Sequence, residues 1–301
     1  MAQRTVGMIG LGIMGSAMSA NLLRAGFRVF GYDVAPRARA AHARAGGAAA
    51  KSPRDVVRRA QILVTSLPSA DALSRVAAEL AASAAHGTIV IETSTLPIPA
   101  KEAARDVLAQ RGVILLDCPL SGTGAQARAK DLIVYASGDR AACRAVAPVL
   151  EGFSRAHYFV GAFGAGSKMK FVANLLVAIH NVAAAEAMVL GMKAGLDPAL
   201  LLKVVSDGAG GSRMLQVRGP MMVKGDYSEA TMKNEVWQKD MTVIADFARK
   251  LDCPTPLFAA SAPFYSAAMA MGLAKQDTGA VCAVLEKMAG NPRRKTKRAR
   301  R

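Results

Sequence analysis

Short apolar runs alternate with longer amphipathic segments along the first half of the chain. The runs predict strands and the segments predict helices, since strands are short and most helices need about ten or more residues. Strands that alternate with helices are typical of a parallel sheet covered by helices on both faces. We expect strands at residues 5–9, 28–32, 62–66, 88–92, 113–118, 132–136 and 156–160, and helices between them that include 69–85, 97–110 and 139–150.

The pattern changes near residues 161–166, and the rest of the chain has the apolar period of helices alone. Residues 167–194 predict one long helix, and Asp197-Pro198 is typical of the start of the next. We therefore expect an α/β domain in residues 1–163 and an all-helical domain for substrate binding and oligomerisation in residues 164–290. Further helices are expected at residues 198–206, 232–251, 256–271 and 279–288.

The first apolar run breaks into the pattern Gly-x-Gly-x-x-Gly, followed by a helical segment and a second apolar run that ends in Asp33. Gly10 permits a tight turn, Gly12 lets the backbone approach a pyrophosphate, and Gly15 lets the helix pack against the sheet. The helix N-terminus presents N–H groups and partial positive charge to phosphates. This order predicts a Rossmann-type, doubly wound sheet that binds a dinucleotide through Gly10, Leu11, Gly12, Ile13, Met14, Gly15 and Asp33.

The acidic residue bears on which dinucleotide binds. Asp33 lies 23 residues after Gly10, where a carboxylate can accept the ribose hydroxyls of NAD and repel the 2′-phosphate of NADP. Arg37 and Arg39 follow closely and leave NADP as an alternative. A turn without a ligand is the other interpretation of the glycines, and the surrounding strand, helix and acid favour the cofactor.

Two later segments carry polar groups, one after an expected strand end, where ligands of open α/β sheets bind, and one at the start of the long helix that we expect to face those strand ends. Residues 121–124, Ser-Gly-Thr-Gly, offer N–H groups and two hydroxyls that suit a small oxyanion, or else they cap a helix. Lys170 and Asn174 are four residues apart and share one face of the long helix. A lysine there can exchange a proton with a carbonyl or alcohol oxygen, and a solvated surface charge is the alternative.

With these motifs, the chain resembles the β-hydroxyacid dehydrogenases, the family of 3-hydroxyisobutyrate dehydrogenase, tartronate semialdehyde reductase and tetronate dehydrogenase. The resemblance covers about residues 5–289. It depends on four segments in order, which are the glycine loop with Asn21-Leu22-Leu23 and Gly26, then Asp117-Cys118-Pro119-Leu120-Ser121-Gly122, then Gly164-Ala165-Gly166 with Lys170 and Asn174, and finally Lys239-Asp240-Met241.

The resemblance implies an NAD(P)-dependent oxidoreductase that interconverts a small β-hydroxy acid and its semialdehyde or keto acid. It implies that Lys170 is the general acid/base and that Asn174 holds the substrate near it. It further implies a carboxylate site formed by Ser121, Gly122 and Thr123, and cofactor contacts from Leu67, Pro68, Thr95 and Lys239.

The chain departs from the pattern of the family at two positions. Thr123 stands where a second glycine is usual, which adds a side chain to the expected substrate loop. Ala173 stands where the first of two asparagines is usual. Arg213 is a candidate for a second anion contact or a surface arginine, and the identity of the hydroxy acid stays open.

Composition and charge limit the other classes of partner. The formal charge is +17, and residues 293–301 hold seven Lys or Arg and no acid, which predicts a disordered, solubilising tail in residues 291–301. No aromatic residues alternate with the basic ones, so we expect no specific nucleic-acid partner. No uninterrupted apolar run suits a membrane span, and the N-terminus lacks a signal-peptide pattern.

The remaining residues with reactive side chains predict a cytoplasmic protein without a metal. Cys118, Cys143, Cys253 and Cys282 are far apart and form no Cys-x-x-Cys, which favours reduced thiols. The four histidines show no metal-ligand spacing. The apolar helices of the second domain predict a homodimer or a homotetramer.

Two other functions are compatible with this scaffold. One is a non-catalytic relative that binds a cofactor or chromatin, and it would have no reason to keep Lys170. The other is an imine reductase, in which that position is not lysine. Lys170, Asn174 and Lys239 are all present, and they favour the dehydrogenase.

Overall fold

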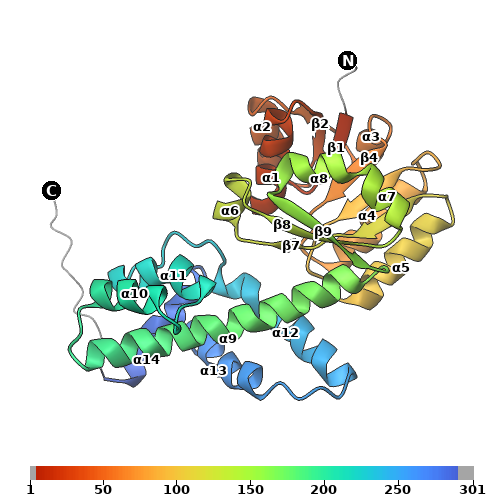
Figure 1. Ribbon diagram of the computed structural model, residues 1–301. Coiled ribbons are helices and arrows are strands. Elements are labelled where there is room, and N and C mark those ends of the chain that lie inside the picture. Colours follow the sequence, from red (N-terminus) through yellow and green to blue (C-terminus); the bar gives the residue numbers. More distant parts are fainter. Residues whose placement is uncertain (1–4, 291–301) are drawn as a thin grey trace. The chain divides into compact units, whose positions relative to one another are not determined.

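The computed structural model describes residues 5–290 (Figure 1). The chain forms two compact units that divide between Val172 and Ala173, within one long helix. The expected boundary at residue 163 stays a prediction, and the basic segment 291–301 lies outside the described residues.

A mostly parallel sheet forms the centre of the first unit (Figure 1). Its strand order is β3-β2-β1-β4-β5-β6-β8-β7, and β9 pairs with β8. The pairs β6–β8 and β7–β8 are antiparallel, and the other pairs are parallel. The strands are β1 (Thr5–Ile9), β2 (Arg28–Tyr32), β3 (Ala48–Ala49), β4 (Ile62–Thr65), β5 (Ile89–Glu92), β6 (Ile114–Asp117), β7 (Leu120–Ser121), β8 (Ile133–Ser137) and β9 (Ala156–Gly161).

Apolar side chains cover both faces of this sheet. Val64, Ile91 and Leu116 belong to one buried cluster, and the preceding residue of each strand, Leu63, Val90 or Leu115, belongs to the other. Successive side chains of a strand point to opposite faces, so a sheet buried on both faces needs continuous apolar runs. These runs are the ones that the sequence shows, and the expected fold class is confirmed.

Helices connect the strands of the first unit: α1 (Ile13–Arg24), α2 (Pro36–Arg44), α3 (Pro53–Val57), α4 (Ala70–Ala81), α5 (Ile98–Ala109), α6 (Gly124–Arg128), α7 (Arg140–Ala145) and α8 (Ala147–Phe153). The single helix expected at residues 139–150 is wrong, because it is broken at Val146 into α7 and α8. Pro148 lies in the first turn of α8, where its missing N–H costs no hydrogen bond.

The described part of the second unit is helical. Its elements after α9 (Ala165–Lys193) are α10 (Pro198–Asp207), α11 (Arg213–Lys224), α12 (Asn234–Lys250), α13 (Pro256–Ala270), the 3-10 helix η1 (Thr278–Ala280) and α14 (Val281–Met288). Polar groups within its core are bonded to one another. Asn181 donates to the Tyr265 hydroxyl at 3.1 Å and to the Thr278 carbonyl at 2.9 Å, while Tyr265 donates to the Ala178 carbonyl at 3.0 Å.

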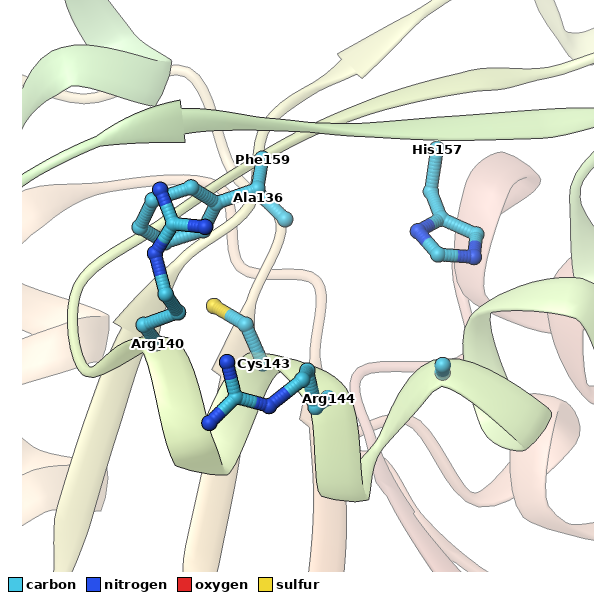
Figure 2. A pocket seen from close by; sticks show the side chains of 7 residues that line it. Ala136, Arg140, Cys143, Arg144, His157 and Phe159 are labelled. Atoms are coloured by element: carbon cyan, nitrogen blue, oxygen red, sulfur yellow. The ribbon is translucent and has the colours of Figure 1, made fainter.

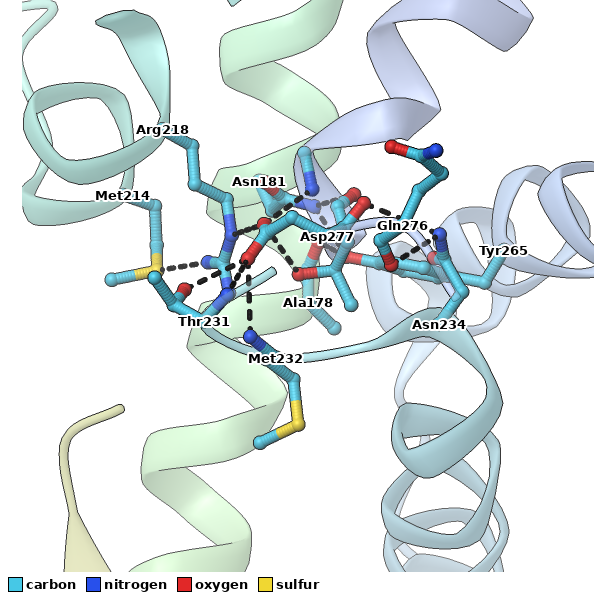
Figure 3. Close-up of polar contacts among 12 residues, drawn as sticks. Ala178, Asn181, Met214, Arg218, Thr231, Met232, Asn234, Tyr265, Gln276 and Asp277 are labelled. Carbon is cyan, nitrogen blue, oxygen red and sulfur yellow. Dashed lines mark hydrogen bonds and ion pairs between the residues drawn. The ribbon is translucent and has the colours of Figure 1, made fainter. Parts of the chain in front are cut away.

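A buried ion pair joins α11 to the segment that precedes η1 (Figure 3). Arg218 Nε lies 2.9 Å from Asp277 Oδ1, and the two side chains are 2% and 0% exposed. Asp277 also accepts the backbone N–H groups of Thr231, Met232 and Gly279 at 2.7, 3.1 and 2.9 Å. The pair therefore links α11 to the segment before α12 and to the start of η1.

Helix α9 is the longest helix described. Its 29 residues are long and apolar enough to cross a membrane by length and composition alone. In the most apolar window of this helix, 44% of the residues are buried within the protein. Asn174 and Asn181 on the same helix donate hydrogen bonds to other helices of the second unit, which is typical of a core helix.

Candidate active site

The glycine loop adopts the tight geometry that its sequence predicts. Gly10 has a φ of +92°, and its N–H donates to the Tyr32 carbonyl at 2.8 Å. A Cβ at Gly10 would lie 2.1 Å from the Ser66 carbonyl oxygen, and one at Gly15 would lie 1.9 Å from the Gly10 carbonyl oxygen. Any side chain at either position would force the loop away from the neighbouring backbone.

Gly12 is the N-cap of α1 and meets the requirement for a phosphate site. A Cβ there would have no atom within 4 Å, so space lies open at the N-terminus of α1. No side chain caps α1, and its first turn carries no acid. The N–H groups and the positive end of the helix dipole are therefore suited to a pyrophosphate, which fits a dinucleotide.

Asp33 lies at the end of β2, and its carboxylate supports the glycine loop. It accepts the Leu11 N–H at 2.7 Å and the Ala35 N–H at 2.8 Å. A carboxylate has about four acceptor positions, so these two bonds leave capacity for ribose hydroxyls. Arg39 donates to the Asp33 carbonyl at 2.6 Å, which places a cation beside this expected ribose site.

The expected cofactor residues after β4 are held by β5. The Leu67 N–H donates to Ser94 Oγ at 2.8 Å, and the Ser94 N–H donates to Glu92 Oε1 at 2.9 Å. Pro68 is exposed and Thr95 is half-buried. The turns after two neighbouring parallel strands are thereby joined at one edge of the sheet.

The expected substrate loop leads from β7 into α6. Gly122 has a φ of +135°, which explains glycine at this position. The Thr123 N–H donates to Gln126 Oε1 at 3.0 Å, so this N–H is engaged in capping α6. The capping interpretation and the ligand interpretation thus both apply, and the donors that remain for a carboxylate are the hydroxyls of Ser121 and Thr123 and the Gly122 N–H.

The substrate loop also packs against the glycine loop. A Cβ at Gly124 would lie 2.6 Å from Ile13 Cγ2. Helices α6 and α1 are neighbours, and Asn21 donates to the Ala127 carbonyl at 2.7 Å. The first unit therefore brings two of the expected binding segments side by side, although the sequence separates them by about a hundred residues.

Three fully buried ionisable side chains lie behind these loops. Lys101 Nζ is 2.6 Å from Glu92 Oε2 and 2.8 Å from Asp117 Oδ1, and all three side chains are 0% exposed. Burial alone would lower the pKa of Lys101, but Glu92 and Asp117 raise it by more, and the pKa lies above its ordinary value. Lys101 is therefore a charged residue inside the first unit.

Lys170 lies in the second turn of α9. Its side chain is buried, with a residue exposure of 8%. Lysine is almost never buried unless it is paired. The alternative interpretation of Lys170 as a solvated surface charge is therefore wrong. Asn174 follows one turn later on the same helix and is 3% exposed.

The second unit holds the other expected polar residues near Asn174. Asn174 Nδ2 donates to Asp240 Oδ2 at 3.0 Å, and Lys239 Nζ lies 3.6 Å from Asp240 Oδ1. Asp240 thereby fixes the orientation of the Asn174 amide, with the nitrogen toward α12. Arg213, the candidate second anion contact, is exposed and contacts Gln216 at 3.5 Å.

A separate cavity in the first unit is lined by none of the expected site residues (Figure 2). Arg140 lies over the Phe159 ring at 4.4 Å from the ring centre, and Arg144 and His157 also line this cavity. Burial raises the pKa of the Cys143 thiol in this cavity to about 11, so the thiol is not a nucleophile at neutral pH.

Sequence reasoning missed the residues that hold the site in place. The sequence motifs do not single out Glu92, Lys101, Ser137 or Ser167, and Asp117 appears only as the first residue of one motif. One signal was present, since Lys101 shares a helix face with Ala104 and Leu108, both of which are buried. A lysine on the apolar face of a helix indicates a buried partner.

Comparisons with known proteins agree with this geometry. A family model of the NAD binding domain of 6-phosphogluconate dehydrogenase matches residues 5–161. A second model, described as NAD-binding of NADP-dependent 3-hydroxyisobutyrate dehydrogenase, matches residues 164–285. L-threonate dehydrogenase from Cupriavidus necator is 36% identical over 282 residues, which covers 92% of this chain and 95% of that protein.

Solved structures are similar over nearly the whole chain. The 3-hydroxyisobutyrate dehydrogenase from Salmonella typhimurium has a TM-score of 0.84 and 32% identity, over 94% of this chain and 100% of that one. The 3-hydroxyisobutyrate dehydrogenase from Mycobacterium tuberculosis, solved with L-serine, has a TM-score of 0.85 and 30% identity, over 94% and 99%. The chain belongs to the β-hydroxyacid dehydrogenase family.

Membership confirms several expectations for this β-hydroxyacid dehydrogenase. It is an oxidoreductase that uses a nicotinamide dinucleotide. The relatives named here are dehydrogenases, so they support the expected enzyme and not its alternatives, a cofactor- or chromatin-binding protein or an imine reductase. The roles of individual residues stay predictions.

Proposed function

We propose that this enzyme interconverts a small β-hydroxy acid and its semialdehyde or keto acid, with Lys170 as the general acid/base. The observation that carries the proposal is the burial of Lys170 at 8% exposure, in the second turn of a helix whose first turn is bonded to the strand ends. A buried lysine beside a reacting oxygen can take or give one proton without the reorganisation of bulk water.

The roles of the polar residues follow from their bonds. Lys170 takes the proton of the substrate hydroxyl during oxidation and returns it during reduction. Asn174, whose Nδ2 is bonded to Asp240, directs Oδ1 to the same hydroxyl or to the Lys170 ammonium. Bound nicotinamide supplies the hydride acceptor or donor. Ser121, Gly122 and Thr123 hold the substrate carboxylate through two hydroxyls and one N–H.

The cofactor is held by the residues at the carboxyl edge of the sheet. Gly10, Gly12 and Gly15 shape the phosphate site, and Leu11, Ile13 and Met14 complete it. Asp33 accepts the ribose hydroxyls, so we expect NAD in preference to NADP. Leu67, Pro68 and Thr95 line the cofactor site, and Lys239 contacts the nicotinamide end.

The substrate is a hydroxy acid of about three or four carbons. Similarity to L-threonate dehydrogenase at 36% identity supports L-threonate as the first acid to test. Thr123 adds a hydroxyl to the carboxylate loop, where the family pattern has glycine, and this favours a substrate with hydroxyl groups near its carboxylate.

The test is turnover measured at 340 nm with NAD⁺ and NADP⁺. The acids are L-threonate, erythronate, D- and L-glycerate, 3-hydroxyisobutyrate and 3-hydroxypropionate. We expect Lys170→Ala to lose about 10²–10⁴-fold in kcat with the preferred acid. Lys168→Ala is the matched control, since Lys168 is an exposed lysine on the same helix and should keep kcat within about twofold. Near wild-type turnover in Lys170→Ala would disprove the assignment.

We also propose that the enzyme works in the cytoplasm without a nucleic-acid or membrane partner.

We further propose that it self-associates as a homodimer or a homotetramer through its second unit. Helix α10 has no buried residue, and Leu200 and Val204 on one face are 59% and 60% exposed. Such a stripe is typical of a surface that another copy covers. Sedimentation of Leu200→Glu/Val204→Glu should show a smaller species than the wild type, and an unchanged species would contradict this surface.

A further inference from the structure

The buried cluster of Glu92, Lys101 and Asp117 holds more negative than positive charge. Two carboxylates face one ammonium, and all three side chains are fully buried. An uncompensated buried carboxylate is costly, so a further positive potential must offset it. The geometry shows that the N-terminus of α9 supplies this potential.

Asp117 is bonded to the first turn of α9 through both carboxylate oxygens. Its Oδ2 accepts the Ser167 N–H at 2.8 Å, and its Oδ1 accepts the Ser167 hydroxyl at 2.8 Å. The N-terminus of a long helix carries partial positive charge and unsatisfied N–H groups. Asp117 therefore satisfies the helix and is itself compensated by it.

Ser137 and Gly166 complete the attachment. The Gly166 N–H donates to Ser137 Oγ at 2.9 Å, and Ser137 Oγ donates to the Asp117 carbonyl at 2.9 Å. A Cβ at Gly166 would lie 2.4 Å from the Tyr135 carbonyl oxygen and 2.6 Å from that of Asp117. The backbone of α9 thus touches the ends of β6 and β8, which fixes its position and its rotation about the helix axis.

Lys170 lies three residues after Ser167, so the attachment decides where its ammonium is held. We propose that Asp117 is a positioning residue for Lys170: it holds the first turn of α9 against the strand ends and thereby sets the placement of the proton-transfer group. This inference rests on the proposed role of Lys170. Asp117 touches neither substrate nor cofactor in this scheme.

The second carboxylate of the cluster serves a different element. Glu92 Oε1 accepts the Ser94 N–H at 2.9 Å, and Ser94 Oγ accepts the Leu67 N–H at 2.8 Å. Glu92 therefore holds the turn after β4, on the expected cofactor side. The Lys101 ammonium thus joins two series of polar contacts. The series through Asp117 leads to helix α9, which carries Lys170, and the series through Glu92 leads to the expected cofactor site.

The two series of contacts, through Asp117 and through Glu92, allow a matched pair of variants. Asp117→Asn and Glu92→Gln each remove one buried carboxylate by an isosteric change, and each leaves Lys101 with one carboxylate partner. Both are therefore expected to fold. We expect Asp117→Asn to lower kcat about 100-fold with L-threonate and NAD⁺, since displacements of about 1 Å cost this much in rate, while the Kd for NADH stays within about threefold.

Glu92→Gln should give the reverse result. The Kd for NADH, measured by fluorescence, should rise about tenfold, and kcat at saturating NAD⁺ should stay within about threefold. Ser167→Ala removes one bond to Asp117 and leaves the cluster intact. We expect about a tenfold lower kcat from it, and it decides the question where Asp117→Asn fails to fold.

Hydrogen exchange of residues 166–171 provides a readout that is independent of turnover. Exchange there should speed up in Asp117→Asn and stay unchanged in Glu92→Gln. The inference is overturned when Asp117→Asn and Ser167→Ala keep kcat within about twofold, or when both carboxylate variants lose kcat equally in proportion to their lost stability. A near wild-type rate in Lys170→Ala would contradict the proposed function instead. The hydrogen exchange of residues 166–171 would still show whether Asp117 holds the first turn of α9.

Discussion

The two units bury ionic groups in contrasting ways. In the first unit, Lys101 joins two carboxylates that come from the ends of β5 and β6. In the second unit, Arg218 faces the single carboxylate of Asp277 (Figure 3). The first cluster carries an excess of negative charge, whereas the second is balanced.

The bonds around each cluster show what the excess charge does. The three backbone donors to Asp277 belong to the segment before α12, at residues 231–232, and to Gly279 in η1. The backbone donors to the first cluster are Ser94, in the turn after β5, and Ser167, in the first turn of α9. The balanced pair holds together elements that carry no proposed site residue, while the unbalanced cluster is bonded to the elements that carry the site.

The largest expected effect is that of removing Lys101, the single cation of the first cluster. Lys101→Met leaves Glu92 and Asp117 buried and facing each other, so the free energy of unfolding should fall by about 5 kcal/mol at pH 7, near the upper end for breaking a buried pair. Urea unfolding at pH 7 measures it.

Lys168→Met is the control for that experiment, because it removes an exposed lysine from the same unit. Its stability should change by less than about 0.5 kcal/mol. Equal stability of Lys101→Met and wild type would show that the cluster is no more stabilising than apolar packing.

A smaller effect is expected from Arg218→Met in the second unit. Asp277 would lose its cation but keep the N–H groups of Thr231, Met232 and Gly279, so the loss should be about 3 kcal/mol. Arg249→Met is the matched control, since Arg249 pairs with Asp246 at 2.8 Å while it is 79% exposed, and it should cost about 0.5 kcal/mol or less.

Turnover adds a second outcome to this experiment. Arg218→Met should keep kcat within about threefold at a temperature where it is folded, because its bonds lead to no proposed site residue. A loss of kcat as large as that of Asp117→Asn would break the contrast between the two units.

The strands were predictable because a sheet buried on both faces needs continuous apolar runs. Three elements were not predictable from the sequence, each for a physical reason. Strands β3 and β7 are two residues long, too short for any period. Helix α11 contains Gly219 and Pro220, which disfavour a helix locally, and packing of Arg218 and Met222 in the core overrides them.

The candidate site was predictable only where one short segment carries the chemistry. The glycine loop is such a segment, since turn, phosphate approach and helix packing follow from three nearby glycines. The cluster around Lys101 depends on three elements that meet in space, and no spacing between Glu92, Lys101 and Asp117 indicates it. The bond from Asn174 to Asp240 likewise joins residues that lie 66 positions apart.

The smallest expected effect concerns how the free energy of unfolding changes at acidic pH. It tests the second cluster, the pair of Arg218 and Asp277. Burial would raise the pKa of Asp277, but Arg218 and the N–H groups of Gly279 and Met232, with the Thr231 hydroxyl, lower it by more, and the pKa lies below its ordinary value. The unfolded chain therefore binds this proton more readily. The stabilisation that the ionised Asp277 carboxylate provides is present above the ordinary carboxyl pKa. It is lost as the pH falls through the pKa of Asp277 in the folded protein.

Asp277→Asn should reduce the slope of unfolding free energy against pH below about pH 5, even though it is less stable at neutral pH. Urea unfolding of the variant and of the wild type between pH 7 and pH 3 measures the two slopes. An unchanged slope in Asp277→Asn would mean that Asp277 gains nothing from Arg218 beyond what water provides. The second cluster would then no longer count as a balanced pair, and the contrast with the cluster around Lys101 would fail.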